Sequence, residues 1–185
     1  QGHSGSQTTN TLYQDISEDI LDIMVVIDNS GSMAEEQNNL STKLAPLLQE
    51  VSGANWRIAV NTTDPVNGCI KSVINKGDAN AAAAFATAVT AGINGSGNER
   101  GVLQAVSGLQ AQCLPQQWIR NNSTIAVLIV SDEDNCSNGT GCSGQPYGSA
   151  NYLSDYLSSI RILGTTARVY GIVWHPSQTQ QQCPT

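Results

Sequence analysis

Two apolar segments of the chain each run directly into side chains that offer oxygen ligands to a hard cation. Residues 20–27 are followed by Asp28, Ser30 and Ser32, and residues 124–130 are followed by Ser131 and Asp132. Hydroxyl and carboxylate oxygens without Cys or His suit Mg²⁺, which keeps several of its waters, whereas Ca²⁺ usually takes more direct carboxylates. We therefore predict a divalent-cation site for Mg²⁺, with Ca²⁺ or Mn²⁺ as alternatives.

A third polar loop, residues 95–99, precedes a predicted helix and brings Ser96 to the same edge of the predicted sheet. A purely structural interpretation stays open for this serine. Ser96 with Glu99, like Ser32 with Glu35, has the spacing of a capping box, in which both side chains satisfy free N–H groups at a helix start.

The remaining polar residues of the two main loops divide by what a helix start needs. No cap uses both Asp28 and Ser30, which both lie before the predicted helix, so these two favour a functional role. Glu133 and Asp134 are expected to be solvated charges at the rim rather than ligands.

The elements that position these loops are predicted from hydrophobic periodicity, with strands alternating with helices along the chain. The expected strands are residues 20–27, 56–62, 69–75, 124–130 and 168–174, and the expected helices are residues 40–51 with a kink at Pro46, 79–91, 99–112 and 153–163. This order predicts a doubly wound α/β fold: a mostly parallel sheet with one antiparallel strand, 69–75, and helices on both faces. If 20–27 and 124–130 are neighbours at the point where strand order reverses, Asp28 and Asp132 face one crevice.

Residues 26–33, Val-Ile-Asp-Asn-Ser-Gly-Ser-Met, resemble the DxSxS signature that opens the von Willebrand factor A (VWA) domain, the fold of integrin inserted domains and many bacterial surface proteins. The stretches 95–101 and 130–134 look most like the secreted bacterial branch of that family. The resemblance implies a Rossmann-like fold with a metal-ion-dependent adhesion site (MIDAS). It also implies that Ser30, Ser32 and Ser96 bind the metal directly, Ser96 standing at the family's Thr position, and that Asp28 and Asp132 act directly or through water.

The resemblance covers residues 20–174, where five strands are expected against six in the family. The final strand and helix are therefore expected to be missing, or to be supplied by another segment or chain. The domain itself is expected over 19–175, after a flexible lead (1–18) and before a Gln-rich tail or the start of an insertion (176–185).

Composition excludes several classes of partner. Eight Lys and Arg against 15 Asp and Glu give a net charge of −7, and the basic residues are scattered, so no nucleic-acid partner is expected. The chain has no apolar run near the ~20 residues that a bilayer crossing needs, so direct membrane insertion is not expected.

The five cysteines suggest an oxidising compartment, because none has the CxxC spacing of a zinc or redox site. Cys136 and Cys142 bracket a short flexible loop and are predicted to form a disulfide, while the pairing of Cys69, Cys113 and Cys183 stays open. We therefore expect an extracellular, cell-surface or periplasmic protein.

The resemblance implies a binding module rather than an enzyme: a metal-dependent adhesion domain whose cation coordinates an Asp or Glu of a protein partner. The alternative is a hydrolase of the haloacid-dehalogenase type that uses Asp28. Such enzymes carry a second carboxylate two residues further on as the proton donor, and Ser30 occupies that position here. A cytoplasmic VWA module serving a metal chelatase is disfavoured by the cysteines.

Overall fold

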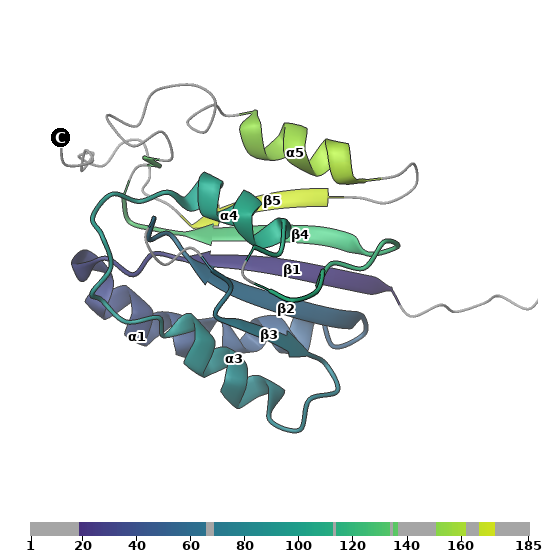
Figure 1. Cartoon of the computed structure of the whole chain (residues 1–185). Helices are drawn as coiled ribbons and strands as arrows, with labels where there is room; N and C mark the ends of the chain where they lie inside the picture. Colours follow the sequence, from purple (N-terminus) through teal and green to yellow (C-terminus); the bar gives the residue numbers. More distant parts are fainter. Residues whose placement is uncertain are drawn as a thin grey trace, which may run out of the picture.

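The computed structural model describes residues 19–65, 69–112, 114–133, 135–136, 151–161 and 167–172. At its centre lies a five-stranded sheet with the order β3-β2-β1-β4-β5 (Figure 1). The strands are β1 (Ile20–Ile27), β2 (Asn55–Thr62), β3 (Ser72–Asn75), β4 (Thr124–Val130) and β5 (Ala167–Ile172). All neighbouring strands run parallel except β2 and β3, which are antiparallel. The predicted doubly wound, mostly parallel sheet is confirmed.

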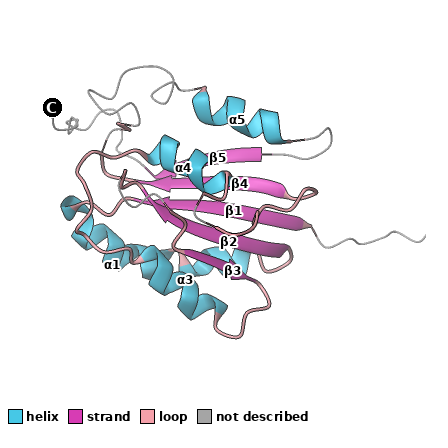
Figure 2. Cartoon of the chain, viewed as in Figure 1, coloured by secondary structure: helices cyan, strands magenta, loops and turns pink. Residues whose placement is uncertain are grey.

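Helices cover both faces of the sheet (Figure 2). One face carries α1 (Ala34–Lys43), α2 (Ala45–Glu50) and α3 (Ala81–Val89), and the other carries α4 (Gly101–Leu109) and α5 (Tyr152–Ile160). Alternate residues of β1 serve the two layers: Ile23, Val25 and Ile27 pack toward α1 and α3, and Met24 and Val26 pack toward α4. This period of two explains why the strand is apolar almost throughout.

Several predicted boundaries shift. The expected kink at Pro46 is a break at Leu44 between α1 and α2, and the proline occupies the first turn of α2, where its missing N–H removes no helical hydrogen bond. The helix expected over 99–112 begins at Gly101. The ends predicted at 163 and 174 lie outside the described residues.

The strand-order reversal lies between β1 and β4, which is the condition under which Asp28 and Asp132 face one crevice. The chain leaves β1 for β2 on one side, and leaves β4 for β5 on the other. Ile27 is in register with Val130, so the residues after both strands emerge side by side. They lie at the end of the sheet where the parallel strands reach their carboxyl ends, which we call the carboxyl edge; it is distinct from the outer strands of the sheet.

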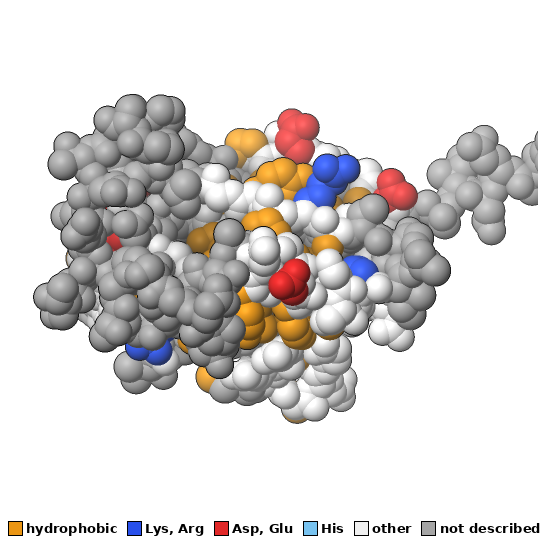
Figure 3. All heavy atoms as spheres, turned by 90° about the horizontal axis from the view of Figure 1, so that it is seen from above, with side chains coloured by type: hydrophobic (Ala, Val, Ile, Leu, Met, Phe, Trp, Pro, Cys, Tyr) orange, Lys and Arg blue, Asp and Glu red, His pale blue; other side chains and the backbone are white. Residues whose placement is uncertain are grey.

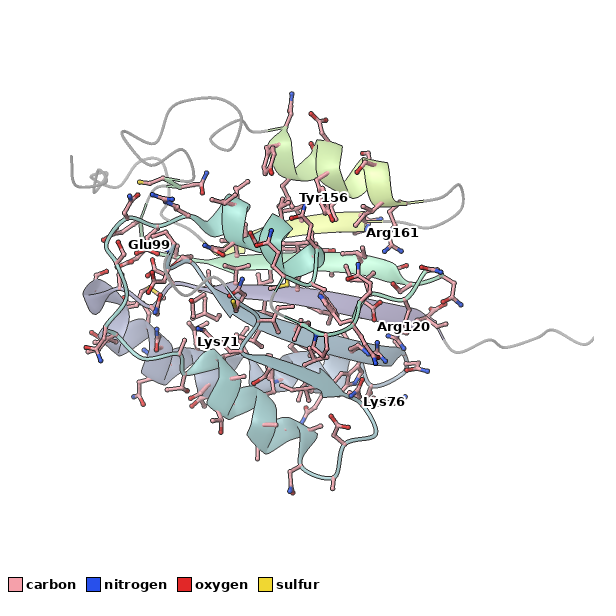
Figure 4. The ribbon with its side chains drawn as sticks, viewed as in Figure 1. Lys71, Lys76, Glu99, Arg120, Tyr156 and Arg161 are labelled. Atoms are coloured by element: carbon pink, nitrogen blue, oxygen red, sulfur yellow. The ribbon has the colours of Figure 1, made fainter. Side chains whose placement is uncertain are left out.

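The single acid inside β1 is explained by a partner distant in sequence. Asp22 is fully buried, and its carboxylate accepts hydrogen bonds from the backbone N–H of Arg120 (2.7 Å), from its Nε (2.9 Å) and from its Nη2 (2.6 Å). The pair fixes the loop before β4 against the amino-terminal part of β1. Figure 4 shows Arg120 at the end of the sheet opposite to Glu99.

Replacing Asp22 with Asn is expected to destabilise the fold by about 3 kcal/mol, because an amide accepts at only one atom and leaves a guanidinium without its counter-charge. Urea unfolding of Asp22→Asn would measure this, with Asp19→Asn, an exposed acid near the same edge, as a control that changes stability by less than about 0.5 kcal/mol. A loss as small as that of the control would show that the pair contributes nothing net.

The surface and the cysteines agree with the composition. On the face that carries α4 and α5, the charged side chains described are scattered and form no basic stripe (Figure 3). Cys69 and Cys136 are each disulfide-bonded. Cys142 lies outside the described residues, so its pairing with Cys136 stays a prediction.

Two further findings concern membranes and the sheet edge. No helix within the described ranges is long and apolar enough to cross a bilayer. Strand β5 is at one edge of the described sheet, where Val169 and Tyr170 are exposed. That another segment or chain extends the sheet stays a prediction.

Candidate metal centre

Asp28 anchors the site at the carboxyl edge of β1. Its backbone N–H donates to the Val130 carbonyl (2.9 Å), which continues the β1–β4 pairing by one residue. Its side chain is fully buried, with Oδ1 accepting from the Ser30 N–H (2.8 Å) and Oδ2 accepting from the Ser131 hydroxyl (2.6 Å). Both carboxylate oxygens are therefore fixed in place, and each keeps a lone pair for a further contact.

A chain of side-chain hydrogen bonds joins the other residues of the two loops. The Ser30 and Ser32 hydroxyls lie 2.9 Å apart, and the Ser32 hydroxyl donates to Asp132 Oδ1 (3.1 Å). We call Asp28, Ser30, Ser32 and Asp132 the carboxyl-edge cluster. Ser32 is exposed and Asp132 is partly buried, so this cluster faces solvent at one end and the sheet edge at the other.

Ser96, the fifth predicted residue, makes a different contact. Its hydroxyl accepts from the Asn98 N–H (3.0 Å), and no hydrogen bond between described residues joins it to the cluster. The capping box also fails to form, because α4 begins only at Gly101 and has no side-chain cap. Ser32 likewise caps nothing, since it lies inside the 3₁₀ turn Gly31–Met33.

The loop that carries Ser96 nevertheless lies against the first loop. The Gly95 N–H donates to the Asn29 carbonyl at 2.7 Å. A Cβ on Gly95 would overlap the Asn29 side chain, so a larger residue at this position would have to displace that side chain. The third loop is thus held at the carboxyl edge of β1, as the alternation of elements predicts.

Gln37 on α1 is a positioning residue that the sequence does not reveal, because it lies within a polar stretch. Its amide nitrogen donates to the carbonyls of Asp28 and Gly92 (both 2.7 Å), and its amide oxygen accepts from the Gly92 N–H (3.0 Å). With only 2% of its surface exposed, it ties the loop after β1 to the chain after α3.

Glu99 is the second residue that sequence reasoning missed. It is 1% exposed, and neither carboxylate oxygen has a hydrogen-bond partner. Burial raises its pKa to about 8; the Thr63 hydroxyl opposes this shift, and the nearby charges of Asp28 and Glu133 add to it. Figure 4 shows Glu99 just before α4, at the edge where β1 and β4 end.

Two more carboxyls at this edge are disfavoured as anions. Burial raises the pKa of Asp132, and the Asp28 charge adds to it while the Ser32 hydroxyl lowers it. Burial also raises the pKa of Glu133, with repulsion from Asp28 and Asp132. Glu133 is partly buried and therefore only partly solvated; that it is a rim charge rather than a ligand stays a prediction, and Asp134 lies outside the described residues.

These observations test whether a cation fits. Several acids crowd one edge, and the oxygens of Glu99 and of Thr63 are buried without partners, which is a costly arrangement unless a positive charge accompanies it. Within the described ranges, no three His, Cys, Asp or Glu side chains are arranged to hold an ion by themselves. A cation here would therefore also need the hydroxyls of Ser30 and Ser32.

Comparison with known proteins finds no matching family model and no similar curated protein. Among solved structures, proximal thread matrix protein 1 from the mussel byssus, with a zinc-occupied MIDAS motif, matches with a TM-score of 0.48 and 15% identity over 84% of this chain and 36% of that chain. The pilus adhesin SpaC from Lactobacillus rhamnosus GG matches in its open conformation with a TM-score of 0.46 and 16% identity, over 66% of this chain and 16% of that chain. This chain therefore corresponds to well under two thirds of the length of either protein.

Proposed function

We propose that this chain is a VWA-type binding module with a MIDAS, in which a divalent cation, Mg²⁺ in the first instance, binds an Asp or Glu of a protein partner. One observation carries the proposal: the three side chains of the DxSxS motif lie together with an acid from the loop after β4, Asp132, which Ser32 contacts. The Ser131 hydroxyl donates to Asp28, the Ser30 and Ser32 hydroxyls are hydrogen-bonded to each other, and the Ser32 hydroxyl donates to Asp132.

The protein's own groups prepare this edge for a cation. The Ser30 N–H and the Ser131 hydroxyl orient the Asp28 carboxylate, and Gln37 fixes its backbone. Hydroxyl ligands carry no charge, so a bound Mg²⁺ would retain positive charge for a partner's carboxylate. Ser32 is exposed, which leaves this end of the cluster open to a partner.

A binding role is favoured over hydrolysis by the groups beside Asp28. Ser30 stands where a dehalogenase-type enzyme carries its proton donor, and it is 2% exposed and hydrogen-bonded to Ser32. Glu99, the carboxyl nearest to Asp28 on the third loop, is 1% exposed and does not reach a substrate in solvent. We also propose an extracellular setting, because Cys69 and Cys136 are disulfide-bonded.

The test uses peptide arrays made in matched pairs, each Asp or Glu peptide beside its Asn or Gln counterpart, probed with the protein in Mg²⁺ and in EDTA. We expect binding only to acidic members and only with Mg²⁺. Moderate salt should weaken binding without abolishing it, because salt screens the attraction between the ion and the carboxylate only in part at such short range, and it also screens the long-range repulsion between the net charge of −7 and an acidic partner. Binding that survives EDTA, or that treats amide and acid members alike, would overturn the proposal.

A further inference from the structure

We propose that the Glu99 carboxylate, and not the Ser96 hydroxyl, is the ligand that the third loop gives to the cation. The inference rests on the proposed metal-binding function and assigns one further ligand to that site. It changes the character of the site, because a neutral oxygen is replaced by a charged one.

Burial is the first argument. Enclosing a carboxylate without well-formed hydrogen bonds is among the most costly arrangements in a protein, and neither oxygen of Glu99 accepts one of normal geometry at 1% exposure, although the Thr63 hydroxyl lies near. Its neighbours make the cost larger, since Asp28 and Glu133 are both acids. A cation at the carboxyl-edge cluster supplies the counter-charge that no described side chain supplies.

The fixed backbone of Glu99 is the second argument. The Cys136 N–H donates to the Glu99 carbonyl (2.5 Å), and the next residue, Arg100, donates its N–H to the Thr63 carbonyl (3.1 Å) at the end of β2. Glu99 is therefore tied to the loops that follow β2 and β4, on either side of Asp28. Its position at the edge does not depend on side-chain contacts, which leaves the carboxylate free to act as a ligand.

Room for a shift of the side chain is the third argument. Glu99 lines a cavity of about 220 Å³ together with Thr63, Ser131 and Glu133. Ser131 is the residue whose hydroxyl donates to Asp28 Oδ2. The cavity therefore adjoins a residue that contacts Asp28, and Ser96 is not among the residues that line it.

The consequence concerns how firmly the ion is held. With Glu99 as a ligand beside Asp28 and the hydroxyls of Ser30 and Ser32, the site carries one more negative charge than with a serine from the third loop. Such a site retains its ion in the absence of a partner. A carboxylate from Glu99, in place of a hydroxyl from Ser96, also makes Ca²⁺ or Mn²⁺ a better fit to the site.

The experiment compares Glu99→Gln with Ser96→Ala by calorimetric titration with Mg²⁺, Ca²⁺ and Mn²⁺. Gln keeps the volume of Glu and removes only the charge. We expect Glu99→Gln to weaken binding of all three ions by at least about 10-fold and Ser96→Ala to leave it unchanged. Melting curves in EDTA show independently that both variants fold, and Glu99→Gln should melt no lower than the wild type at pH 8.

Other outcomes overturn the inference. If Ser96→Ala weakens binding, or if Glu99→Gln does not, the third-loop ligand is not Glu99, and a neutral structural role for its carboxyl is favoured. Asp28→Asn, measured in parallel, separates this failure from a failure of the proposed function. Retained binding in Asp28→Asn would reject the cation site itself, whatever Glu99 does.

Discussion

Asp28→Asn is expected to weaken Mg²⁺ binding by about 100-fold or more while the domain remains folded. The substitution removes the charge that lies deepest in the carboxyl-edge cluster. It keeps the volume, and it keeps the hydrogen bonds: the amide oxygen accepts from the Ser30 N–H, and the amide nitrogen donates to the Ser131 hydroxyl, which can act as an acceptor. Removing one of several crowded negative charges should, if anything, stabilise the metal-free protein.

Calorimetric titration and a melting curve in EDTA measure the two halves of this prediction. Asp64→Asn is the matched control, because Asp64 is also a buried acid, 5% exposed, just beyond β2 at the same edge of the sheet. It should leave Mg²⁺ affinity within about twofold of the wild type. Unchanged affinity in Asp28→Asn would contradict the site, and a collapsed fold would mean that Asp28 is structural.

The metal-free protein is expected to lose stability as the pH rises from about 4.5 to about 8. The pKa of Glu99 is about 8 in the folded protein, against the ordinary value of 4.5 that applies in the unfolded chain. The folded state therefore holds a proton that the unfolded state has released, and this contribution is complete below pH 4.5 and gone above pH 8. At about 1.4 kcal/mol per pKa unit, the loss amounts to at most about 5 kcal/mol. The raised pKa values of Asp132 and Glu133 act in the same direction.

Urea unfolding in EDTA at pH 5 and pH 8 measures this slope. Glu99→Gln provides the control, since it has no proton to lose and should flatten most of the slope. Saturating Mg²⁺ should also raise stability at pH 8, because a ligand that binds only the folded state stabilises it. A metal-free wild type that is equally stable at both pH values would show that Glu99 titrates near its ordinary pKa.

The sequence predicts the fold well where a signal is local. Residues 20–27 and 124–130 match β1 and β4 in their bounds, because buried central strands are apolar on both faces and polar residues end them abruptly. Their adjacency is only a condition at the level of the sequence, because alternating strands and helices do not fix the strand order; the structure supplies it. Asp28, Ser30, Ser32 and Asp132 are accordingly brought together in the structure as the motif indicates.

The missed residues depend on contacts between segments far apart in the chain. Gln37 is recognisable only once Gly92, 55 residues later, lies beside it. The pattern from Ser96 to Glu99 fits a cap and a ligand loop equally well in sequence. The start of α4 at Gly101 and the path of the loop past Asn29 decide that Glu99 points inward.

The ion pair of Asp22 with Arg120 has a consequence for how this domain can change over time. Asp22 lies near the start of β1 and Asp28 directly after its end, about 20 Å apart along the chain, and the two carboxylates share no hydrogen-bond partner. The strand therefore separates a stabilising anchor from a ligand-binding rim. Mutations that adapt the carboxyl-edge cluster to a new ion or partner should leave the contribution of the Asp22–Arg120 pair to the free energy of unfolding unchanged. This end of the domain can therefore diversify without a loss of that stability.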